Sequence, residues 1–227
     1  DGKPVAHQVF PGNTADVDTF KMAMEDLKKR FKIRRVILVG DRGMVSRKVL
    51  RQIEDSGLEY IVGVRMRRLK AMDGVLNRPG RYRTVKKNLK VKEVVENGTR
   101  YIVCLNPEEA ERDRKAREEM VAKLEQKLKS GFKSLVGNRG YRRYLKVDGA
   151  EVTINQEALK EEARFDGKYV LETNSELAPD EVAMAYKDLW RVERAFRELK
   201  SGLDLRPIYH WSESRVRGHI MVCFLAF

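Results

Sequence analysis

A hydrophobic pattern in the last part of the chain predicts an amphipathic helix from Tyr186 to Lys200. At about 100° per residue, apolar positions recur within one arc of this helix and would form a stripe that faces the core. The stripe consists of Ala185, Leu189, Val192, Phe196, Leu199 and Leu203. We therefore expect this face of the helix to be buried.

A second row of side chains lies about a quarter turn from the stripe and runs nearly in line along the helix. It consists of Tyr186, Trp190, Glu193, Arg197 and Lys200. A carboxylate flanked by a phenol, an indole and two cations suits a site that binds a metal ion and a phosphate together. The alternative is an ordinary solvated face, because Glu193–Arg197 and Arg194–Glu198 have the spacing of ion pairs on many exposed helices. Spacing alone leaves both interpretations open.

The segment 34–39 contains the apolar run Val-Ile-Leu-Val and is bounded by Gly40, which predicts a strand buried on both faces in a parallel or mixed sheet. Asp41 follows at its carboxyl end, where open α/β sheets place ligand sites, so Asp41 is a functional candidate. Ordinary turn chemistry is the alternative, because Asp and Gly often follow a strand. Ser46 is expected to cap a helix that ends near Gly57, and residues 60–64 to form the next strand.

The rest of the pattern predicts further strands and helices. The expected elements are a strand at 5–10, a helix from Thr14 or Asp16 to Phe31, a hairpin of residues 90–96 and 99–105 around Asn97-Gly98, a charged helix at 108–130, a strand at 141–147, a helix at 156–163, a strand at 169–172 and a final helix capped by Ser212. Between residues 65 and 87, closely spaced Arg and Lys could track a phosphate backbone or form a solvated basic loop.

Composition narrows the class of partner. The 227 residues suffice for one large domain or two small ones, and a 42% hydrophobic content is enough for a real core. The 47 Lys and Arg exceed the 34 Asp and Glu, which gives a net charge of +13. This excess favours a polyanionic partner, usually nucleic acid, over a protein whose basic charge only aids solubility.

Cysteine usage and hydropathy bear on the compartment. Cys104 and Cys223 are isolated, so neither a disulfide framework nor a zinc site is indicated, and we expect a reducing, cytoplasmic compartment. The apolar run at 220–227 is far shorter than the roughly 20 residues of a membrane span, and no signal peptide opens the chain, so no membrane is expected as a partner. Since the chain begins at Asp1 without Met and stops inside that run, we expect a fragment of a longer protein.

Tyr186, Glu193 and Lys200, spaced seven residues apart, resemble the Tyr-Arg-Glu-Lys signature of DDE transposases from bacterial insertion sequences. Leu189 stands at the position of the signature Arg, and Arg197 is our candidate to share its role. The stretch V-I-L-V-G-D-R-G-M-V-S resembles the second-Asp region of the same family, with Asp41 as the metal ligand. The resemblance runs from V-F-P-G-N-T near the start to G-H-I-M-V-C-F-L-A near the end.

The resemblance implies an α/β fold, a ribonuclease H-like mixed sheet flanked by helices and interrupted by a β-containing insertion. Residues 1–64 would form the first part of the catalytic core. Residues 65–165 would form the insertion subdomain, and residues 166–227 the second part of the core with the Glu-bearing helix.

The implied activity is DNA transposition, in which DNA is cleaved at element ends and the 3′-hydroxyl is transferred to target DNA. Asp41 and Glu193 would hold Mg²⁺, or Mn²⁺ in its place, for a two-metal phosphoryl transfer. The family's first Asp lies on a strand before residue 5, so we expect residues 1–227 alone to be inactive. The residues implied to bind DNA are Tyr186, Trp190, Arg197, Lys200 and Arg206.

The implied partners are the element ends and the target DNA, bound by a homodimer in a synaptic complex at the bacterial nucleoid. Two alternatives stay open. One is a catalytically dead, basic DNA-binding or interaction fragment, in which the helix at 108–130 mediates assembly. The other is a nuclease of the same fold.

Overall fold

A computed structural model describes residues 6–11, 13–14, 16–32, 35–41, 46–68, 71–130, 139–148 and 151–227. The chain divides into two compact units. Unit 1 contains Asp1–Val62 and Met184–Phe227, and unit 2 contains Gly63–Ala183. Each unit has its own buried clusters, so each is described by itself.

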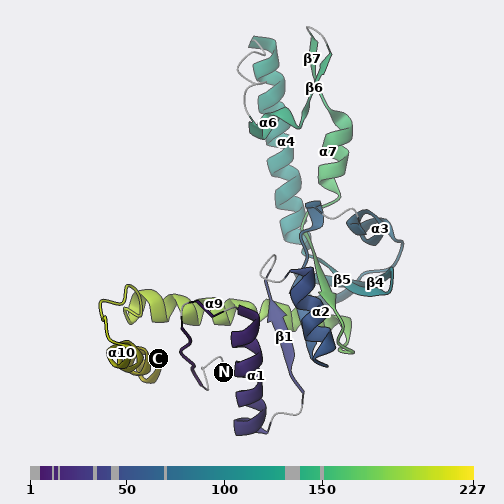
Figure 1. The fold of residues 1–227 in the computed structure, drawn as a ribbon. Helices are drawn as coiled ribbons and strands as arrows, with labels where there is room; N and C mark the ends of the chain where they lie inside the picture. The colour runs from purple at the N-terminus through teal and green to yellow at the C-terminus, as the bar shows by residue number, and fades with distance from the viewer. Residues whose placement is uncertain are drawn as a thin grey trace. The chain divides into compact units, whose positions relative to one another are not determined.

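The N-terminal part of unit 1 is a strand-helix-strand element, as the apolar pattern predicts. Its elements are α1 (Asp16–Phe31), β1 (Ile37–Gly40), α2 (Arg47–Asp55) and β2 (Glu59–Gly63). Strands β1 and β2 pair in parallel, with Leu38 opposite Tyr60, and α2 is the crossover between them (Figure 1). Buried Leu50 and Ile53 of α2 pack against Tyr60 and Val62 of β2.

Local signals set both ends of α2. Ser46 Oγ accepts a hydrogen bond from the Val49 amide at 3.3 Å, so the predicted cap is confirmed. At the other end Gly57 adopts a left-handed φ of 65°, and the Leu58 amide donates to the Ile53 carbonyl at 3.1 Å. This bond reverses the chain and leads it into β2.

The C-terminal part of unit 1 is helical but broken. Its elements are the end of α8 (Pro179–Lys187), α9 (Leu189–Arg197), the π-helical turn η2 (Glu198–Gly202) and α10 (Glu213–Ala226). The prediction of one helix from Tyr186 to Lys200 is therefore wrong. Helix α9 begins after Asp188, which forms no side-chain cap hydrogen bond but pairs with Arg191 at 3.3 Å.

Two further expectations for unit 1 also fail. The apolar stripe of α9 is not core, because Val192 is 49% and Phe196 53% exposed and no α9 residue is buried. Periodicity marks the face that would gain from burial, but burial itself depends on a tertiary neighbour. Of the predicted strand at 5–10, Val5 lies outside the described residues, and 6–10 form no strand. His7 instead stacks on Phe224 of α10, with ring centroids 4.7 Å apart.

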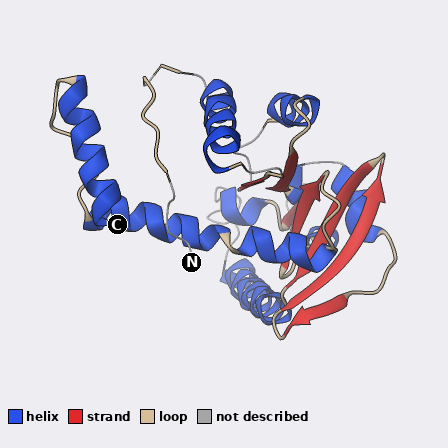
Figure 2. Cartoon of the chain, turned by 90° about the horizontal axis from the view of Figure 1, so that it is seen from below, coloured by secondary structure: helices blue, strands red, loops and turns tan. Residues whose placement is uncertain are grey.

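Unit 2 contains a layer of antiparallel strands in the order β8-β5-β4-β3, which Figure 2 shows as a twisted layer. The strands are β3 (Arg83–Lys86), β4 (Leu89–Glu96), β5 (Thr99–Leu105) and β8 (Lys168–Thr173), and they are preceded by the 3-10 turn η1 (Met66–Arg68) and by α3 (Ala71–Asn77). Met72 and Val75 of α3 pack with Val94, Tyr101 and Val103. Asn97 and Gly98 both have positive φ, 50° and 76°, as a tight hairpin turn requires, which confirms that prediction.

The rest of unit 2 is a second hydrophobic body. It consists of α4 (Pro107–Ser130), α6 (Arg139–Arg142), β6 (Leu145–Asp148), β7 (Glu151–Ile154) and α7 (Gln156–Ala163). Helices α4 and α7 run alongside one another, and their shared core includes buried Leu124, Tyr144 and Leu145 (Figure 1). The strand predicted at 141–147 begins only at Leu145, because Tyr141 reaches this core from the helical turn α6.

A short junction joins this body to β8. Arg117 of α4 forms a two-point ion pair with Asp166, at 2.5 and 2.6 Å, and both side chains are mostly buried. The Gly167 amide donates to Asp113 at 2.9 Å, and its carbonyl accepts from the Asn106 amide at 2.8 Å. Gly167 has a φ of 59°, and a Cβ there would lie 2.4 Å from the Asn106 carbonyl oxygen.

Parallel and antiparallel pairing both occur, with helices against the strands, so the predicted mixed α/β class is confirmed. It is consistent with the ribonuclease H-like fold that the resemblance implies. The compact unit 2 begins at Gly63 and continues beyond residue 165 through β8. The subdomain boundaries at 64 and 165 stay a prediction.

Candidate active site and nucleic-acid interface

Asp41 lies directly after β1, at the edge where the parallel strands β1 and β2 both end. Gly40 is buried, whereas the Asp41 side chain is exposed. The hydroxyl of half-buried Tyr186, on α8, donates a hydrogen bond to Asp41 Oδ1 at 2.8 Å. This bond links two candidate residues that are 145 positions apart in sequence, and places them at the strand edge where α/β folds bind ligands.

Glu193 lies on α9 with an exposed side chain. Seven residues of regular helix return a side chain to nearly the same face, roughly 10 Å along the axis. Between Tyr186 and Glu193 the helix breaks at Asp188, which keeps right-handed torsion angles with φ −68° and ψ −9°. Among the described residues, no group of three or more His, Cys, Asp or Glu is placed to hold a metal ion. The pairing of Glu193 with Asp41 around shared ions therefore stays a prediction.

The two ion pairs of an ordinary solvated face are not formed. In the described part of the chain, neither Glu193–Arg197 nor Arg194–Glu198 comes within ion-pair distance, although all four residues are described. Trp190 is 52% exposed, and the Arg191 guanidinium lies 5.9 Å from its ring centroid. The charged groups of α9 therefore face solvent without neutralising one another.

Lys200 and Arg206 lie beyond α9, and both are exposed. Lys200 lies in η2, where the Leu203 amide donates to the Glu198 carbonyl five residues earlier at 3.0 Å. A π-turn holds more residues than an α-turn, so Lys200 is rotated away from the straight row that a regular helix would give. The Lys200 ammonium lies 5.7 Å from the centroid of the Phe196 ring.

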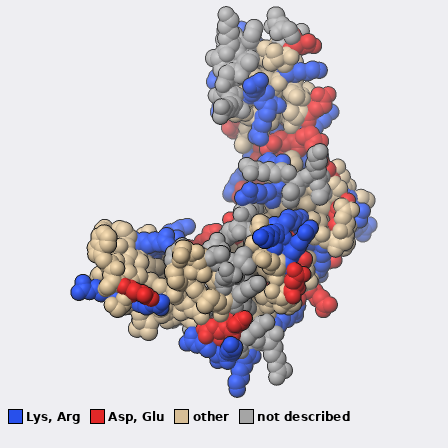
Figure 3. Space-filling view, in the orientation of Figure 1, with Lys and Arg blue, Asp and Glu red and all other residues tan. Residues whose placement is uncertain are grey.

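The basic stretch between 65 and 87 has many internal partners. The pairs are Arg67 with Glu162, Arg78 with Glu96, Arg83 with Asp180 and Lys87 with Glu108. Figure 3 shows Lys and Arg side chains interleaved with Asp and Glu on the visible face, without one continuous basic patch. Several of these cations therefore form ion pairs within unit 2 itself, which leaves fewer of them free for a phosphate backbone.

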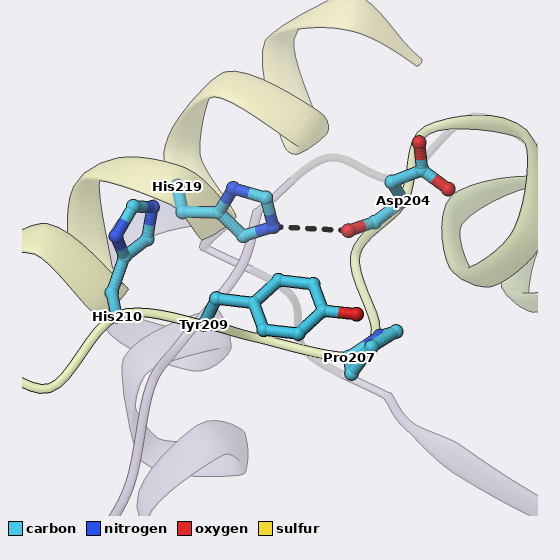
Figure 4. Close-up of a pocket in the computed structure, with 5 residues that line it drawn as sticks. All are labelled: Asp204, Pro207, Tyr209, His210 and His219. Atoms are coloured by element: carbon cyan, nitrogen blue, oxygen red, sulfur yellow. Dashed lines mark hydrogen bonds between the residues drawn. The ribbon is translucent and has the colours of Figure 1, made fainter.

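One cavity was missed at the sequence level. Its lining residues, drawn in Figure 4, are Asp204, Pro207, Tyr209, His210 and His219, and its volume is about 430 Å³. The local signal was an aromatic run, I-Y-H-W, directly after a proline. Only the tertiary structure brings His219 of α10 against that run.

Two comparisons with known proteins bear on the identity of the chain. The family model described as "Transposase DDE domain" matches residues 1–227. A search of curated proteins found no match. Within the described residues, no helix is both long and apolar enough to cross a membrane.

Proposed function

Because the chain belongs to the family of transposase DDE domains, and thus to the proteins of DNA transposition, we propose that it cleaves DNA at element ends. In this proposal it then transfers the freed 3′-hydroxyl to target DNA. It belongs to the insertion-sequence branch with the Tyr-Arg-Glu-Lys signature, and Asp41 and Glu193 are its metal ligands.

The observation that carries the proposal is the hydrogen bond from Tyr186 to Asp41, 2.8 Å long. Tyr186 is the first residue of the signature, and Asp41 comes from the separate second-Asp motif. Two motifs identified independently in the sequence thus meet at one strand edge. The bond also orients the Asp41 carboxylate, as partners of metal ligands commonly do.

The donor set fits a hard divalent cation in kind. Both Asp41 and Glu193 are exposed carboxylates, and Mg²⁺ and Mn²⁺ prefer oxygen ligands and retain several waters. When bound, such an ion stabilises charge on the attacking and leaving oxygens of phosphoryl transfer. The resemblance places a further aspartate before residue 5, and residues 1–227 offer no carboxylate that we assign to its role.

The exposed side chains around Glu193 hold the DNA. Lys200 and Arg206 contact phosphates, because each offers an exposed cation. Trp190 offers an exposed indole face, and Tyr186 holds the transferred end beside Asp41. Arg197, without an ion-pair partner on α9, takes over from the signature Arg that Leu189 replaces. A homodimer holds both element ends at once, in the bacterial cytoplasm at the nucleoid.

The test is nicking of a labelled duplex that carries the element's terminal repeat. Three chains are compared in Mg²⁺: residues 1–227, a chain extended upstream through the strand that bears the first aspartate, and the extended chain with Glu193→Gln. The extended chain should cleave, and Glu193→Gln should lower the rate about a hundred-fold or more, since loss of a partner of a metal ligand alone costs about 10- to 100-fold. Glu198→Gln, an exposed neighbour on the same segment, is the matched control and should cleave normally.

Full activity of Glu193→Gln would remove Glu193 from the site. An inert extended chain that still binds DNA would favour the DNA-binding alternative, and cleavage without strand transfer would favour a nuclease. Lys200→Ala separates DNA contact from metal binding. It should weaken binding to all sequences alike and lower the slope of log affinity against log salt by roughly one.

A further inference from the structure

The loop between η2 and α10 is held by main-chain contacts at its base. Nε2 of His219 lies 3.1 Å from the carbonyl oxygen of Asp204, and the Cys223 thiol donates to the Leu203 carbonyl at 3.2 Å. Asp204 itself has a positive φ of 49°. Residues 203 and 204 are thereby held against α10.

The cavity described above lies between this loop and α10. In the view of Figure 4, the Tyr209 ring extends below the His219 imidazole, with its hydroxyl pointing toward Pro207 and with His210 at the opposite end. The rings of His210 and His219 are 5.5 Å apart and meet edge to face, at 67°. The cavity volume, about 430 Å³, lies within the usual range for small-molecule sites. A planar ring system is the shape that such an aromatic slot accepts.

The side chains around the slot face solvent. Tyr209 is 81% exposed, and Trp211 is fully exposed. The faces of both rings are therefore open to a ligand. Arg206 and Arg215 flank the same loop, are exposed, and form no ion pair within the described residues, whereas Arg217 pairs with Glu213. The rim therefore offers positive charge beside stacking surface.

We propose that this slot binds one unpaired base of single-stranded DNA, stacked between Tyr209 and His219, while Arg206 and Arg215 contact the flanking phosphates. Stacking faces combined with cations that follow the backbone are the chemistry of single-strand binding. In a duplex the faces of each base are covered by its neighbours, so only an unstacked base can enter. The proposal rests on the proposed function only in taking DNA as the ligand, and it requires neither Asp41, Glu193 nor a metal ion.

The test measures binding of a labelled single-stranded oligonucleotide to the chain of residues 1–227 in the presence of a chelator, beside a duplex of the same length. Tyr209→Ala should weaken single-strand binding about five-fold or more and leave duplex binding unchanged, given the usual contribution of one stacked base. Tyr209→Phe keeps the ring and should bind like the parent chain. Phe31→Ala, which removes an exposed aromatic ring from α1, is the matched control.

A second readout reports the base directly. A single-stranded oligonucleotide that carries 2-aminopurine should lose fluorescence on binding, because stacking on an aromatic ring quenches it, and Tyr209→Ala should restore the signal. Equal losses of single-strand and duplex affinity in Tyr209→Ala would overturn the inference, as would binding indistinguishable from the parent. Either result leaves the cleavage test of Glu193 unaffected, so the two proposals fail separately.

Discussion

Helices α4 and α9 carry similar residues at similar spacings and use them in opposite ways. On α4 the charged side chains pair with one another, Arg114 with both Glu111 and Glu118 and Arg112 with Glu109. On α9 the equivalent pairs stay unformed. Spacing permits an ion pair, but the rotamers that the surroundings favour decide whether it forms. The unpaired set on α9 follows directly after α8, whose Tyr186 donates to Asp41.

The apolar faces of the two helices differ in the same sense. Leu124 of α4 is fully buried among α6, α7 and the β6–β7 hairpin, whereas Phe196 of α9 is 53% exposed. The α4 face has tertiary neighbours, and the α9 face has none that bury it within the described residues. A charged helix with a buried apolar face is a packing element, and one with both faces open is a surface for other molecules.

Of the substitutions that test this contrast, Leu124→Ala should lower the stability of the fold most. It removes a fully buried side chain from the α4 core and should lower the free energy of unfolding by about 2–5 kcal/mol. Urea unfolding followed by circular dichroism measures the loss. Lys123→Ala on the exposed side of the same helix serves as the control and should stay close to the parent chain. A near-neutral Leu124→Ala would mean that α4 has no packed core in solution.

A buried lysine in unit 2, Lys92, should make the stability depend on pH. Burial, with repulsion from Lys168, lowers the pKa of Lys92 below 10.5. The unfolded chain then binds more protons just below 10.5, so the unfolding free energy rises as pH rises toward that value, by at most about 1.4 kcal/mol per pH unit and group. Burial also raises the pKa of Tyr82 above 10.0, so its contribution to the unfolding free energy is lost as pH rises above 10.0. The measurements should therefore stay below pH 10.0.

Lys92→Met should flatten this rise in unfolding free energy with pH, and Lys200→Met, at an exposed position, is the control variant. Urea titrations at a series of pH values between about 8 and 9.5 measure it. Lys92 donates a hydrogen bond to the Arg78 carbonyl at 2.7 Å, so its replacement also changes the stability at every pH. The slope, and not the absolute value, is therefore the readout. An identical slope in both variants would contradict the assignment to Lys92.

Phe196→Ala should have the smallest effect on the stability of the fold. Its ring is already half in water, so little apolar area is lost, and the unfolding free energy should fall by less than about 1 kcal/mol. The same urea titration used for Leu124→Ala measures it. A loss of unfolding free energy as large as that of Leu124→Ala would show that the apolar face of α9 is buried in solution. It would contradict the difference described between the two helices.

The sequence predicted elements best where local chemistry decides them. Ser46 before α2 and Asn97-Gly98 between β4 and β5 are signals that need no distant partner, and both were found in place. Strand β1 and helix α7 were also predicted, from short apolar runs and their spacing, and both are present. The missed elements, β3, β7 and α3, are short and depend on packing against neighbours for their stability.

The candidate site likewise contains features that the sequence predicted and features that depend on tertiary structure. Asp41 was assignable because it follows an apolar strand, and the structure adds its bond to Tyr186, which no spacing could reveal. The burial of the α9 stripe was predicted wrongly because periodicity cannot supply the opposing surface. The break at Asp188 and the widened turn at Glu198 depend on backbone hydrogen bonding that several residue types tolerate equally.

The junction at Gly167 has a consequence for how this sequence can diverge. A side chain there would meet both a left-handed backbone and the main chain of residues 106 and 110, at distances that no rotamer relieves. The α4 residues Arg112, Arg114 and Glu118 are exposed and form only surface ion pairs, so these positions tolerate exchange freely. In a library of single substitutions, or among diverged copies of the gene, position 167 should remain glycine while the exposed positions of α4 vary.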